Sequence, residues 1–591
     1  MRLALLTRAL AVVMATLLPS AAALAEPRAP QTERKLDKAL QEALRRAGGG
    51  QVPVIIQTTD AGRVAVARTL AAKGHPIAGE FRNIGAISAA VDVADLAALV
   101  ADPAVTAVSL DAPIAAHATL PGPDSFVTLD AVRNDIGSRA LTTLTGRGVG
   151  VAVIDSGIAN IPDVHDQMGP FYDFTNGGKA TAAFDDCGHG THIAATIGSS
   201  GKQNGYLYQG IAPKVRLIGL KVLDKKCAGT TSAVLNALAF ATANKAALGI
   251  DVINLSLGHP IYESAATDPL VRAVEAAVRA GIVVVVSAGN NGRNPTTGLV
   301  GYGGITSPGN APSAITVGAV NTSGTLNRSD DFVAAYSSRG PSWFDGYAKP
   351  DLVAPGHRIV ADTTGSAVLY KDHSTWRVAA PAGASGQYMR LSGSSMSVAV
   401  ASGIVALVLE ANRTALQADG TAMASLNPYA VKAILQYTAT PLAGADALAQ
   451  GTGEINAGGA IALTRAIDTR ASTWTTYPLV TTSTFGSEVD AWSNTLIAGA
   501  TKLATLAPGV ALNGANVLWG ENIVWGENIL WGDNVLWGEN ILWGDNIVWG
   551  ENLVWGENIL WGENVVWGEN IVWGENVVYG DNVVWGEFVD D

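Results

Sequence analysis

A six-residue repeat near the C-terminus constrains the fold of this chain more tightly than any other sequence feature. The pattern Asn, two apolar residues, Trp, Gly and an acid runs from Asn516 to Glu587 in twelve copies, with Tyr579 replacing one Trp. Because six is an even number, a strand would keep each repeat position on one face of a sheet. The Gly-acid-Asn triplet in every copy is a turn signal, which leaves about three strand residues between turns.

Short strands separated by turns at a fixed period predict a repetitive β tail of the β-solenoid type, in which coils stack on one another. Three sides per coil would give four coils. A membrane barrel is disfavoured because spanning strands need about 9–11 residues. Disorder is disfavoured because the repeat is rich in Trp, Ile, Leu and Val.

The repeat contains no nucleophile, base or positive charge, so we expect the chemistry to lie elsewhere. From Asn516 to Asp591 there are 14 acids and no Lys or Arg, which accounts for the formal net charge of −13, and no basic patch suggests nucleic acid binding. We interpret the tail as a structural or adhesive module that binds a surface component. Calcium binding by its acid and Asn ladders, or removal as a C-terminal pro-segment, are alternatives that the sequence leaves open.

The N-terminus has the pattern of a signal peptide over residues 1–25. Arg2 and Arg8 precede an apolar run that ends in a small-residue cleavage motif before Glu26. A membrane anchor is the alternative, and no later segment offers about 18 uninterrupted apolar residues, so we predict no membrane span. The sequence predicts a secreted protein, with the periplasm or cell surface as alternatives. The only two cysteines, Cys187 and Cys227, can pair in such a compartment.

Two domains are expected between the signal peptide and the tail. After a linker at 26–51, residues 52–114 show the order strand, helix, strand, helix, strand, which predicts a small α+β unit of ferredoxin-like type. Residues 115–468 alternate near-continuous apolar strands with helices, which predicts an α/β domain with a parallel sheet covered on both faces. Residues 469–515 are Thr-, Ser- and Ala-rich and are expected to be a linker with some ordered pieces.

Four polar side chains stand where chemistry is expected in such a sheet, at strand ends and helix starts. Asp155 ends the strand "VAVID", and Asn290 follows the strand "VVVVSAG". His189 lies in the small-residue segment "CGHGTH", where His192 is a competing candidate. Ser395 lies at a tight turn into an apolar helix. Each residue alone could be a cap or turn residue.

Together these residues form a known kind of constellation. A serine hydroxyl becomes a nucleophile when a histidine takes its proton, and an aspartate fixes the tautomer of that histidine. An amide N–H stabilises the oxyanion that develops during acyl transfer.

The sequence resembles the subtilisin-like serine peptidases, the subtilase family. The resemblance covers about Val149 to Asn456 and rests on the stretches "VIDSGI", "GHGTHIAAT", "GIAPKVRLIGLKVLD", "INLSLG", "SAGNNG", "SSRGP", "KPDLVAPG" and "GSSMS". It implies a subtilisin-like parallel sheet flanked by helices.

The resemblance also implies a role for each candidate. Asp155 would be the triad acid, His189 the base and Ser395 the nucleophile. Asn290 would be the oxyanion donor beside the Ser395 backbone N–H, and His192 would be structural. A separate set would pair with the substrate backbone and wall the first specificity pocket: Ser256, Leu257 and Gly258.

The same resemblance implies that residues 52–114 are an inhibitory prodomain, a partner that the chain removes by self-cleavage between about Ile114 and Asp124. It implies a disulfide between Cys187 and Cys227. The segment Ser199–Gln209 departs from the Asn-rich form of the family's calcium loop, so calcium is not assigned and no metal or cofactor is predicted. Val398, Ala399 and Val400 replace the usual Ser-Pro-His after the nucleophile, which should alter the helix start modestly.

The leading hypothesis is therefore a secreted serine endopeptidase, made as a zymogen, that acts on protein or peptide substrates. We expect it to prefer apolar or large side chains before the cleaved bond. The alternative is a cell-surface adhesion or binding protein with an inactive protease-like domain.

Overall fold

The computed structural model describes most of the chain between Lys35 and the last repeats. The described parts are residues 35–45, 50–118, 126–293, 298–325, 327–415, 425–466, 481–485, 488–497 and 499, and the strands of the tail between 517 and 584. The predicted signal peptide at 1–25 and most of the two predicted linkers lie outside them.

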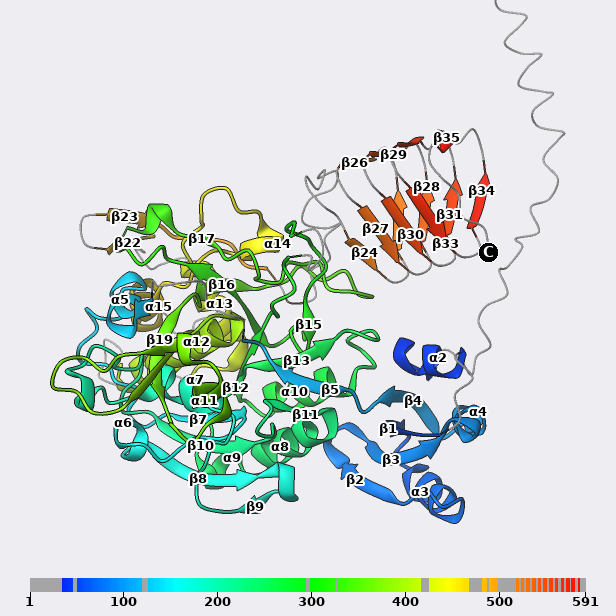
Figure 1. Cartoon of the computed structure of the whole chain (residues 1–591), viewed down its shortest axis with the longest axis horizontal. Coiled ribbons are helices and arrows are strands. Elements are labelled where there is room, and N and C mark those ends of the chain that lie inside the picture. Colours follow the sequence, from blue (N-terminus) through cyan, green and yellow to red (C-terminus); the bar gives the residue numbers. More distant parts are fainter. Residues whose placement is uncertain are drawn as a thin grey trace, which may run out of the picture.

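The largest sheet has nine strands, and its central strands are parallel. The strand order is β17-β16-β14-β12-β7-β10-β8-β9, and β18 also pairs with β16 (Figure 1). The strands are β7 (Gly150–Asp155), β8 (Met168–Asp173), β9 (Lys179–Ala180), β10 (Arg216–Lys221), β12 (Val252–Leu255), β14 (Val283–Ser287), β16 (Ile315–Asn321), β17 (Phe332–Val333) and β18 (Leu352–Pro355). This is the predicted α/β architecture, with short antiparallel strands added at the edges.

Helices cover both faces of this sheet, as the apolar strands require. Along β7, Val151 and Val153 belong to one core cluster, while Ala152 and Ile154 belong to the other. The helices of the first face are α5 (Leu129–Asp135), α7 (His189–Gly198), α12 (Ser394–Thr414), α13 (Pro428–Thr438) and α15 (Ala457–Ala466), and those of the second are α8 (Thr231–Ala243) and α10 (Pro269–Arg279).

Shorter elements complete the domain. The helices are α6 (Pro162–His165), α9 (Lys245–Leu248), α11 (Val368–Asp372) and α14 (Ala447–Gln450), and the strands are β6 (Val127–Thr128), β11 (Ala228–Thr230), β13 (Leu257–Pro260), β15 (Thr306–Ser307), β19 (Ile359–Thr363), β20 (Arg377–Val378) and β21 (Gln387–Leu391). Within the described residues, α12 is the one helix long and apolar enough to span a membrane, and it is buried inside the domain.

The N-terminal unit is an antiparallel four-stranded sheet in the order β2-β3-β1-β4. Its elements are α2 (Lys38–Arg45), β1 (Gln51–Thr58), α3 (Arg63–Ala72), β2 (Ile77–Phe81), β3 (Ala86–Asp92), α4 (Val93–Ala101) and β4 (Val105–Leu110). The sequence prediction lacked β2, whereas a loose helix was one of its two interpretations of residues 26–48, where α2 lies. Strand β2 was missed because Pro76 and Gly79 interrupt the segment, and its register shifts between Ile77 and Gly79.

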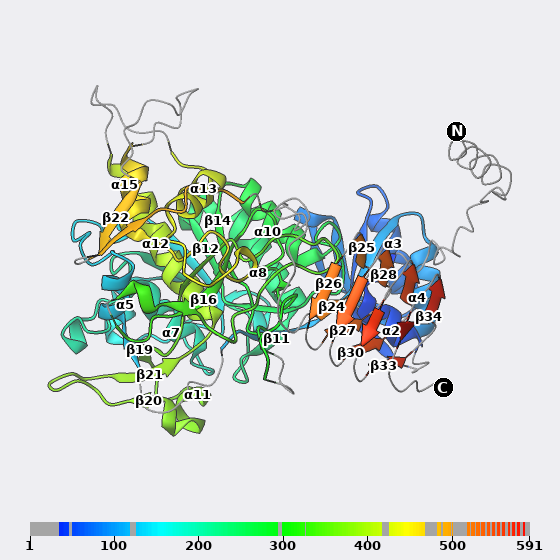
Figure 2. The ribbon, with the colours of Figure 1, turned by 90° about the horizontal axis from the view of Figure 1, so that it is seen from above.

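Strand β1 of this unit is apolar on both faces. Val54 and Ile56 pack into the unit's own core with α3 and α4. Ile55, between them, points the other way and joins Phe81 and Ile84 in the core cluster that contains α8 and α10. The unit therefore docks through its second sheet face onto these two helices (Figure 1, Figure 2).

The connection between the two domains is itself a strand, β5 (Pro113–Ala116). It lies between β11 and β13 and pairs antiparallel with both. The predicted domain limit at residue 114 thus falls inside a strand that the second domain holds.

The predicted linker after residue 468 contains an ordered piece. A hairpin of β22 (Thr482–Phe485) and β23 (Glu488–Ala491) leads to Trp492, which is buried in the core of the α/β domain. The domain therefore extends beyond its predicted end.

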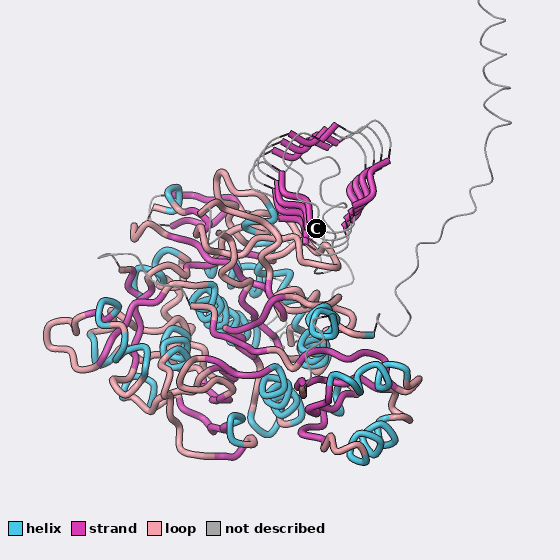
Figure 3. The backbone as a smooth tube through the Cα atoms, turned by 45° about the vertical axis from the view of Figure 1, so that its right-hand side comes forward, coloured by secondary structure: helices cyan, strands magenta, loops and turns pink. Residues whose placement is uncertain are grey.

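The twelve tail strands form three parallel four-stranded sheets, drawn end-on in Figure 3 as a three-sided stack. Each strand pairs in register with the strand three copies later, so that Val517 faces Val535 and Asn522 faces Asn540. The strands are β24 (Val517–Trp519), β25 (Asn522–Trp525), β26 (Asn528–Trp531), β27 (Asn534–Trp537), β28 (Asn540–Trp543), β29 (Asn546–Trp549), β30 (Asn552–Trp555), β31 (Asn558–Trp561), β32 (Val565–Trp567), β33 (Asn570–Trp573), β34 (Asn576–Tyr579) and β35 (Val583–Val584).

Candidate active site

Asp155 and His189 meet at the carboxyl edge of the parallel sheet. Asp155 is the last residue of β7, and His189 is the first residue of α7. Asp155 Oδ1 lies 2.8 Å from His189 Nδ1 and also accepts a hydrogen bond of 2.7 Å from the Ser156 N–H. Both side chains are fully buried. A carboxylate acceptor at Nδ1 fixes the tautomer in which Nε2 is free to accept a proton.

Asp185 holds the helix that carries the candidate base, a role that the sequence prediction missed. Its carboxylate accepts the backbone N–H groups of Cys187 (3.1 Å), Gly188 (2.8 Å) and Thr191 (2.8 Å) at the start of α7. It also accepts the Ser156 hydroxyl at 3.0 Å, which links α7 to the end of β7. Burial raises the pKa of Asp185 even though these donors oppose the shift. The signal was the doubled acid in "DDCGHGTH".

His192 lies apart from the acid. Its Nε2 lies 3.1 Å from the Ile359 carbonyl and 3.2 Å from the Met389 carbonyl, and so donates to strands β19 and β21. Burial lowers the pKa of His192 to about 3. The side chain is thus a neutral link within the core.

Ser395 lies in the first turn of α12 and is fully buried. Its hydroxyl donates to the Ser256 carbonyl at 3.0 Å rather than to His189. Within the described part of the chain, His189 Nε2 has no hydrogen-bond partner. The contact expected of an acid–base pair is therefore formed, while the contact expected between nucleophile and base would require the Ser395 hydroxyl to turn away from Ser256; catalytic hydrogen bonds often tighten only when substrate is engaged.

Asn290 is held with its amide N–H toward an approaching carbonyl. Its Oδ1 accepts from the Ser394 N–H at 2.9 Å and from the Ser394 hydroxyl at 3.1 Å. Its Nδ2 donates at 2.6 Å to the carbonyl oxygen of His117, just after β5. A Cβ on Gly393 would lie 2.2 Å from that same oxygen, so only glycine leaves room for it. The predicted second donor, the Ser395 backbone N–H, stays a prediction.

The chain's own β5 lies along the residues predicted to bind substrate. Ala116 pairs with Leu257 and Ala115 with Gly258, and the His117 N–H donates to the Ser256 carbonyl at 3.2 Å. On its other side β5 pairs with β11. An extended segment thus lies between β11 and β13 and leads to His117. Sequence reasoning did not single out His117, because nothing in "PIAAHATL" marks one residue as special.

The predicted disulfide between Cys187 and Cys227 is present. Cys187 precedes the base by two residues, and the Cys227 carbonyl accepts the Ala116 N–H at 3.3 Å. The bond therefore connects the start of the base helix to the strand that borders the cleft.

The loop Ser199–Gln209, where no metal ligand was predicted, is held by a protein carboxylate. Asp163 accepts the Ser200 hydroxyl at 2.6 Å, the Gln203 N–H at 3.1 Å and the Asn204 side-chain amide at 3.2 Å.

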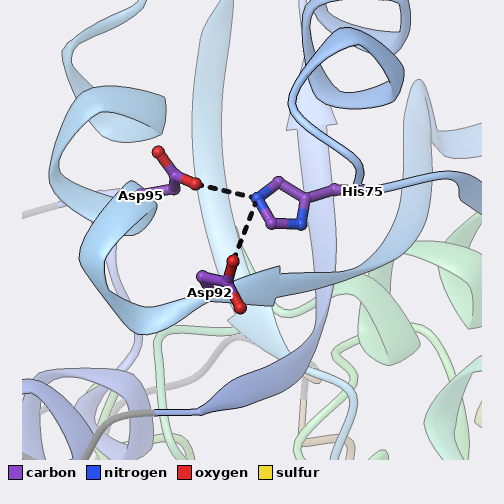
Figure 4. A group of neighbouring side chains, drawn as sticks. All are labelled: His75, Asp92 and Asp95. Carbon is purple, nitrogen blue, oxygen red and sulfur yellow. Dashed lines mark hydrogen bonds and ion pairs between the residues drawn. The ribbon is translucent and has the colours of Figure 1, made fainter.

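Two groups of three side chains in the described residues lie close enough to share a metal ion: His75, Asp92 and Asp95, and Asp135, Asp331 and Glu454. In the first group (Figure 4), His75 Nε2 lies 2.8 Å from Asp95 and 3.9 Å from Asp92. These are the contacts of an ion-pair cluster, and Lys73 adds a further pair to Asp95 at 2.7 Å. In the second group, Arg328 pairs with Glu454 at 3.0 Å. Neither group includes a triad residue, and no metal is assigned.

Comparisons with known proteins agree on one family. Residues 146–454 match the pattern described as the subtilase family. The chain is 38% identical over 320 residues to serine protease AprX of Bacillus subtilis, and the alignment covers 53% of this chain and 66% of AprX. It is 31% identical over 344 residues to subtilisin E of Bacillus subtilis, and this alignment covers 58% of this chain and 75% of subtilisin E. In structure it is similar to fervidolysin from Fervidobacterium pennivorans, a keratinolytic enzyme related to subtilisin, with a TM-score of 0.54, 21% identity and coverage of 71% of this chain and 62% of fervidolysin. That last likeness concerns the fold alone.

Proposed function

Because this chain belongs to the subtilase family of serine endopeptidases, we propose that it is an exported zymogen that hydrolyses peptide bonds through Asp155, His189 and Ser395. The observation that carries the proposal is the position of the His117 carbonyl. Its oxygen accepts the Asn290 amide N–H, and its own residue follows a strand paired with the cleft edge. The chain thus presents one of its own peptide bonds to the candidate triad.

The chemistry follows from this placement. The Ser395 hydroxyl attacks the His117 carbonyl carbon while His189 Nε2 takes its proton, and Asp155 stabilises the resulting imidazolium. Negative charge moves to the carbonyl oxygen, where the Asn290 N–H stabilises it. As the bond to Ala118 breaks, His189 returns the proton to the leaving amine. Water then hydrolyses the ester on Ser395.

The first substrate is therefore the chain itself, and the cut falls between His117 and Ala118. Cleavage there separates the N-terminal unit from the peptidase domain without removing it. β5 stays paired with β11 and β13, and Asp111 still accepts the Ser232 N–H and hydroxyl at 2.7 Å each at the start of α8. The unit thus acts as an inhibitor until it is released or degraded, and other proteins or peptides are substrates afterwards.

Export is supported by two features. The signal-peptide pattern at 1–25 gives the route, and the Cys187–Cys227 bond is of the kind that persists in oxidising compartments. We propose that the repeat tail then binds a surface component and keeps the enzyme there.

Substitution of the nucleophile tests the proposal. Wild-type protein should show Ala118 as a new N-terminus, react with a fluorophosphonate at Ser395 and hydrolyse casein. Ser395→Ala should remain uncut, unlabelled and inactive. Ser313→Ala removes a hydroxyl at the surface, where it contacts Tyr429 at 3.2 Å, and should behave as wild type. Equal processing and casein hydrolysis by wild type and Ser395→Ala would refute the assignment, and absence of labelling would favour the adhesion protein.

A further inference from the structure

The side chain before the proposed cut makes a hydrogen bond to a buried serine hydroxyl. His117 Nδ1 lies 2.7 Å from the hydroxyl of Ser287. Ser287 is the last residue of β14 and is fully buried. We propose that Ser287 is a specificity-determining residue that selects a neutral imidazole side chain immediately before the cleaved bond. This inference rests on the proposed peptidase function and extends it to the substrate.

A second close contact of the imidazole favours a flat ring. Gly258, on β13, faces the imidazole so closely that a Cβ there would lie 2.8 Å from His117 Cε1. The ring therefore lies against bare backbone, while the hydroxyl of Ser287 meets one ring nitrogen. A planar side chain with a polar edge matches both contacts.

The polar contact discriminates between rings. A serine hydroxyl can donate to an unprotonated ring nitrogen or accept from a protonated one, so it matches either tautomer of neutral histidine. A phenylalanine ring would fill the same space and leave the buried hydroxyl without a partner. Sites built to hydrogen-bond a substrate group reject analogues that lack the group, because their own polar atoms are then left unpaired.

The surroundings of His117 disfavour a positive charge on its ring. Burial lowers the pKa of His117 to about 3, and the nearby His189 on α7 and His259 on β13 act in the same direction. His259 in turn lies near Asp111, the acidic group of the connecting segment. Histidine therefore binds uncharged, and lysine or arginine should be poor residues at this position.

The proposed preference for histidine refines the expectation of an apolar or large side chain before the cleaved bond. The residue is large, but its recognition is polar. The sequence did not reveal this because Ser287 ends the apolar run "IVVVVS", where a strand-ending serine has no distinguishing pattern.

Synthetic peptides that copy the chain's own segment test the inference. Processed wild-type enzyme is given Ile-Ala-Ala-X-Ala peptides in which X is His, Phe, Leu or Lys, and kcat/KM is measured. We expect His to exceed Phe by about tenfold, the size expected when one buried polar group loses its partner. In Ser287→Ala the His peptide should lose about five- to tenfold while the Phe peptide keeps its rate or gains. Ser313→Ala should leave every ratio unchanged.

A pH profile separates recognition from folding. Free histidine titrates near pH 6.5, so the kcat/KM ratio of His to Phe should fall about tenfold from pH 7.5 to 5.5. Both peptides require the same triad, so its own pH dependence cancels in the ratio. Equal rates for His and Phe, an unchanged ratio in Ser287→Ala, or a ratio insensitive to pH would each overturn the inference. If no peptide shows turnover that depends on Ser395, the proposed function itself has failed.

Discussion

Strands β7 and β1 are each apolar on both faces, and their second faces are covered in different ways. In β7 of the peptidase domain, Val151 and Val153 face one core while Ala152 and Ile154 face the other, and the domain's own helices cover both. In β1 of the N-terminal unit, Ile56 faces the unit's own helices, whereas Ile55 packs in the cluster of α8 and α10. The second face of the N-terminal unit is thus covered by a different domain.

If the chain is cut after His117 as proposed, this difference would allow the N-terminal unit to leave while the sheet of the α/β domain stays intact. Removing the N-terminal unit exposes apolar surface on both partners, which favours association. It does not open the core that holds Asp155 and His189, because that core is closed by α7 and α12. After the proposed cleavage, the N-terminal unit would be held to the α/β domain only by noncovalent contacts, and a partner held in this way can dissociate.

The largest expected loss of stability in the α/β domain comes from removing the disulfide between Cys187 and Cys227. Replacing Cys187 and Cys227 with serine reopens a loop with a sequence separation of 40 residues, and the chain-entropy relation gives about 4 kcal/mol of lost stability for a loop of that size. Urea unfolding in the Ser395→Ala background, where self-digestion is absent, measures this loss. A change below about 1 kcal/mol would show that the unfolded chain gains little freedom when the bond is absent.

Ile55 and Ile56 give a matched pair across the two faces of β1. Ile56→Ala should destabilise the N-terminal unit itself by about 2–5 kcal/mol, the usual result for a buried isoleucine. Ile55→Ala should leave the unit folded and weaken its docking. In the Ser395→Ala background, hydrogen exchange should rise throughout β1 and β3 for Ile56→Ala. For Ile55→Ala, the increase should be confined to the docked surface of α8 and α10. Identical exchange patterns would remove the distinction between the two faces.

The interface also contains carboxyl groups that should make release depend on pH. Burial raises the pKa of Glu263 to about 8 and that of Asp37 to about 6, and nearby Asp268 adds to both shifts. Asp37 comes from the N-terminal unit, and the other two from the segment leading into α10. Since the docked state binds protons more tightly than the separated state, docking is most stable below the ordinary carboxyl pKa and weakens as pH rises toward 8.

After self-cleavage, the lag before peptidase activity appears should therefore be about tenfold shorter at pH 8.5 than at pH 6, since a proton lost per group changes the equilibrium by up to tenfold per pH unit. Glu263→Gln should flatten this dependence. Exposed Glu80, on β2, provides the control: Glu80→Gln should keep the wild-type profile. A lag that lengthens with pH would reverse the assigned sign.

Much of this arrangement could be predicted from sequence, and the exceptions share a cause. The apolar strands and the positions of Asp155, His189 and Ser395 follow from local pattern and motif. The two faces of β1 could not be told apart, because "VPVIIQT" reads the same whether one domain or two cover it.

The contacts of His117 and Ser287 depend on residues distant in the chain. Their nitrogen–oxygen contact joins positions 170 residues apart, and no local periodicity encodes it. Asp185 differs, because the backbone N–H donors at Cys187, Gly188 and Thr191 are close in sequence and only the Ser156 hydroxyl comes from a distant element, the end of β7.

Deletion of the tail should have the smallest effect on peptidase activity. The tail differs from both domains discussed above because each of its strands pairs with other copies of the same repeat. Its strands pair with one another at a step of three copies, as in the pairing of β24 with β27, so its sheets are built within the tail. Deleting residues 516–591 should therefore leave kcat/KM for small peptides within about twofold of wild type, since surface changes away from packed features usually shift stability by under about 0.5 kcal/mol. Retention on the producing cells should fall instead, which fractionation with an antibody to the peptidase domain measures. A tail-less enzyme that cannot hydrolyse small peptides would show that the tail supports the active site.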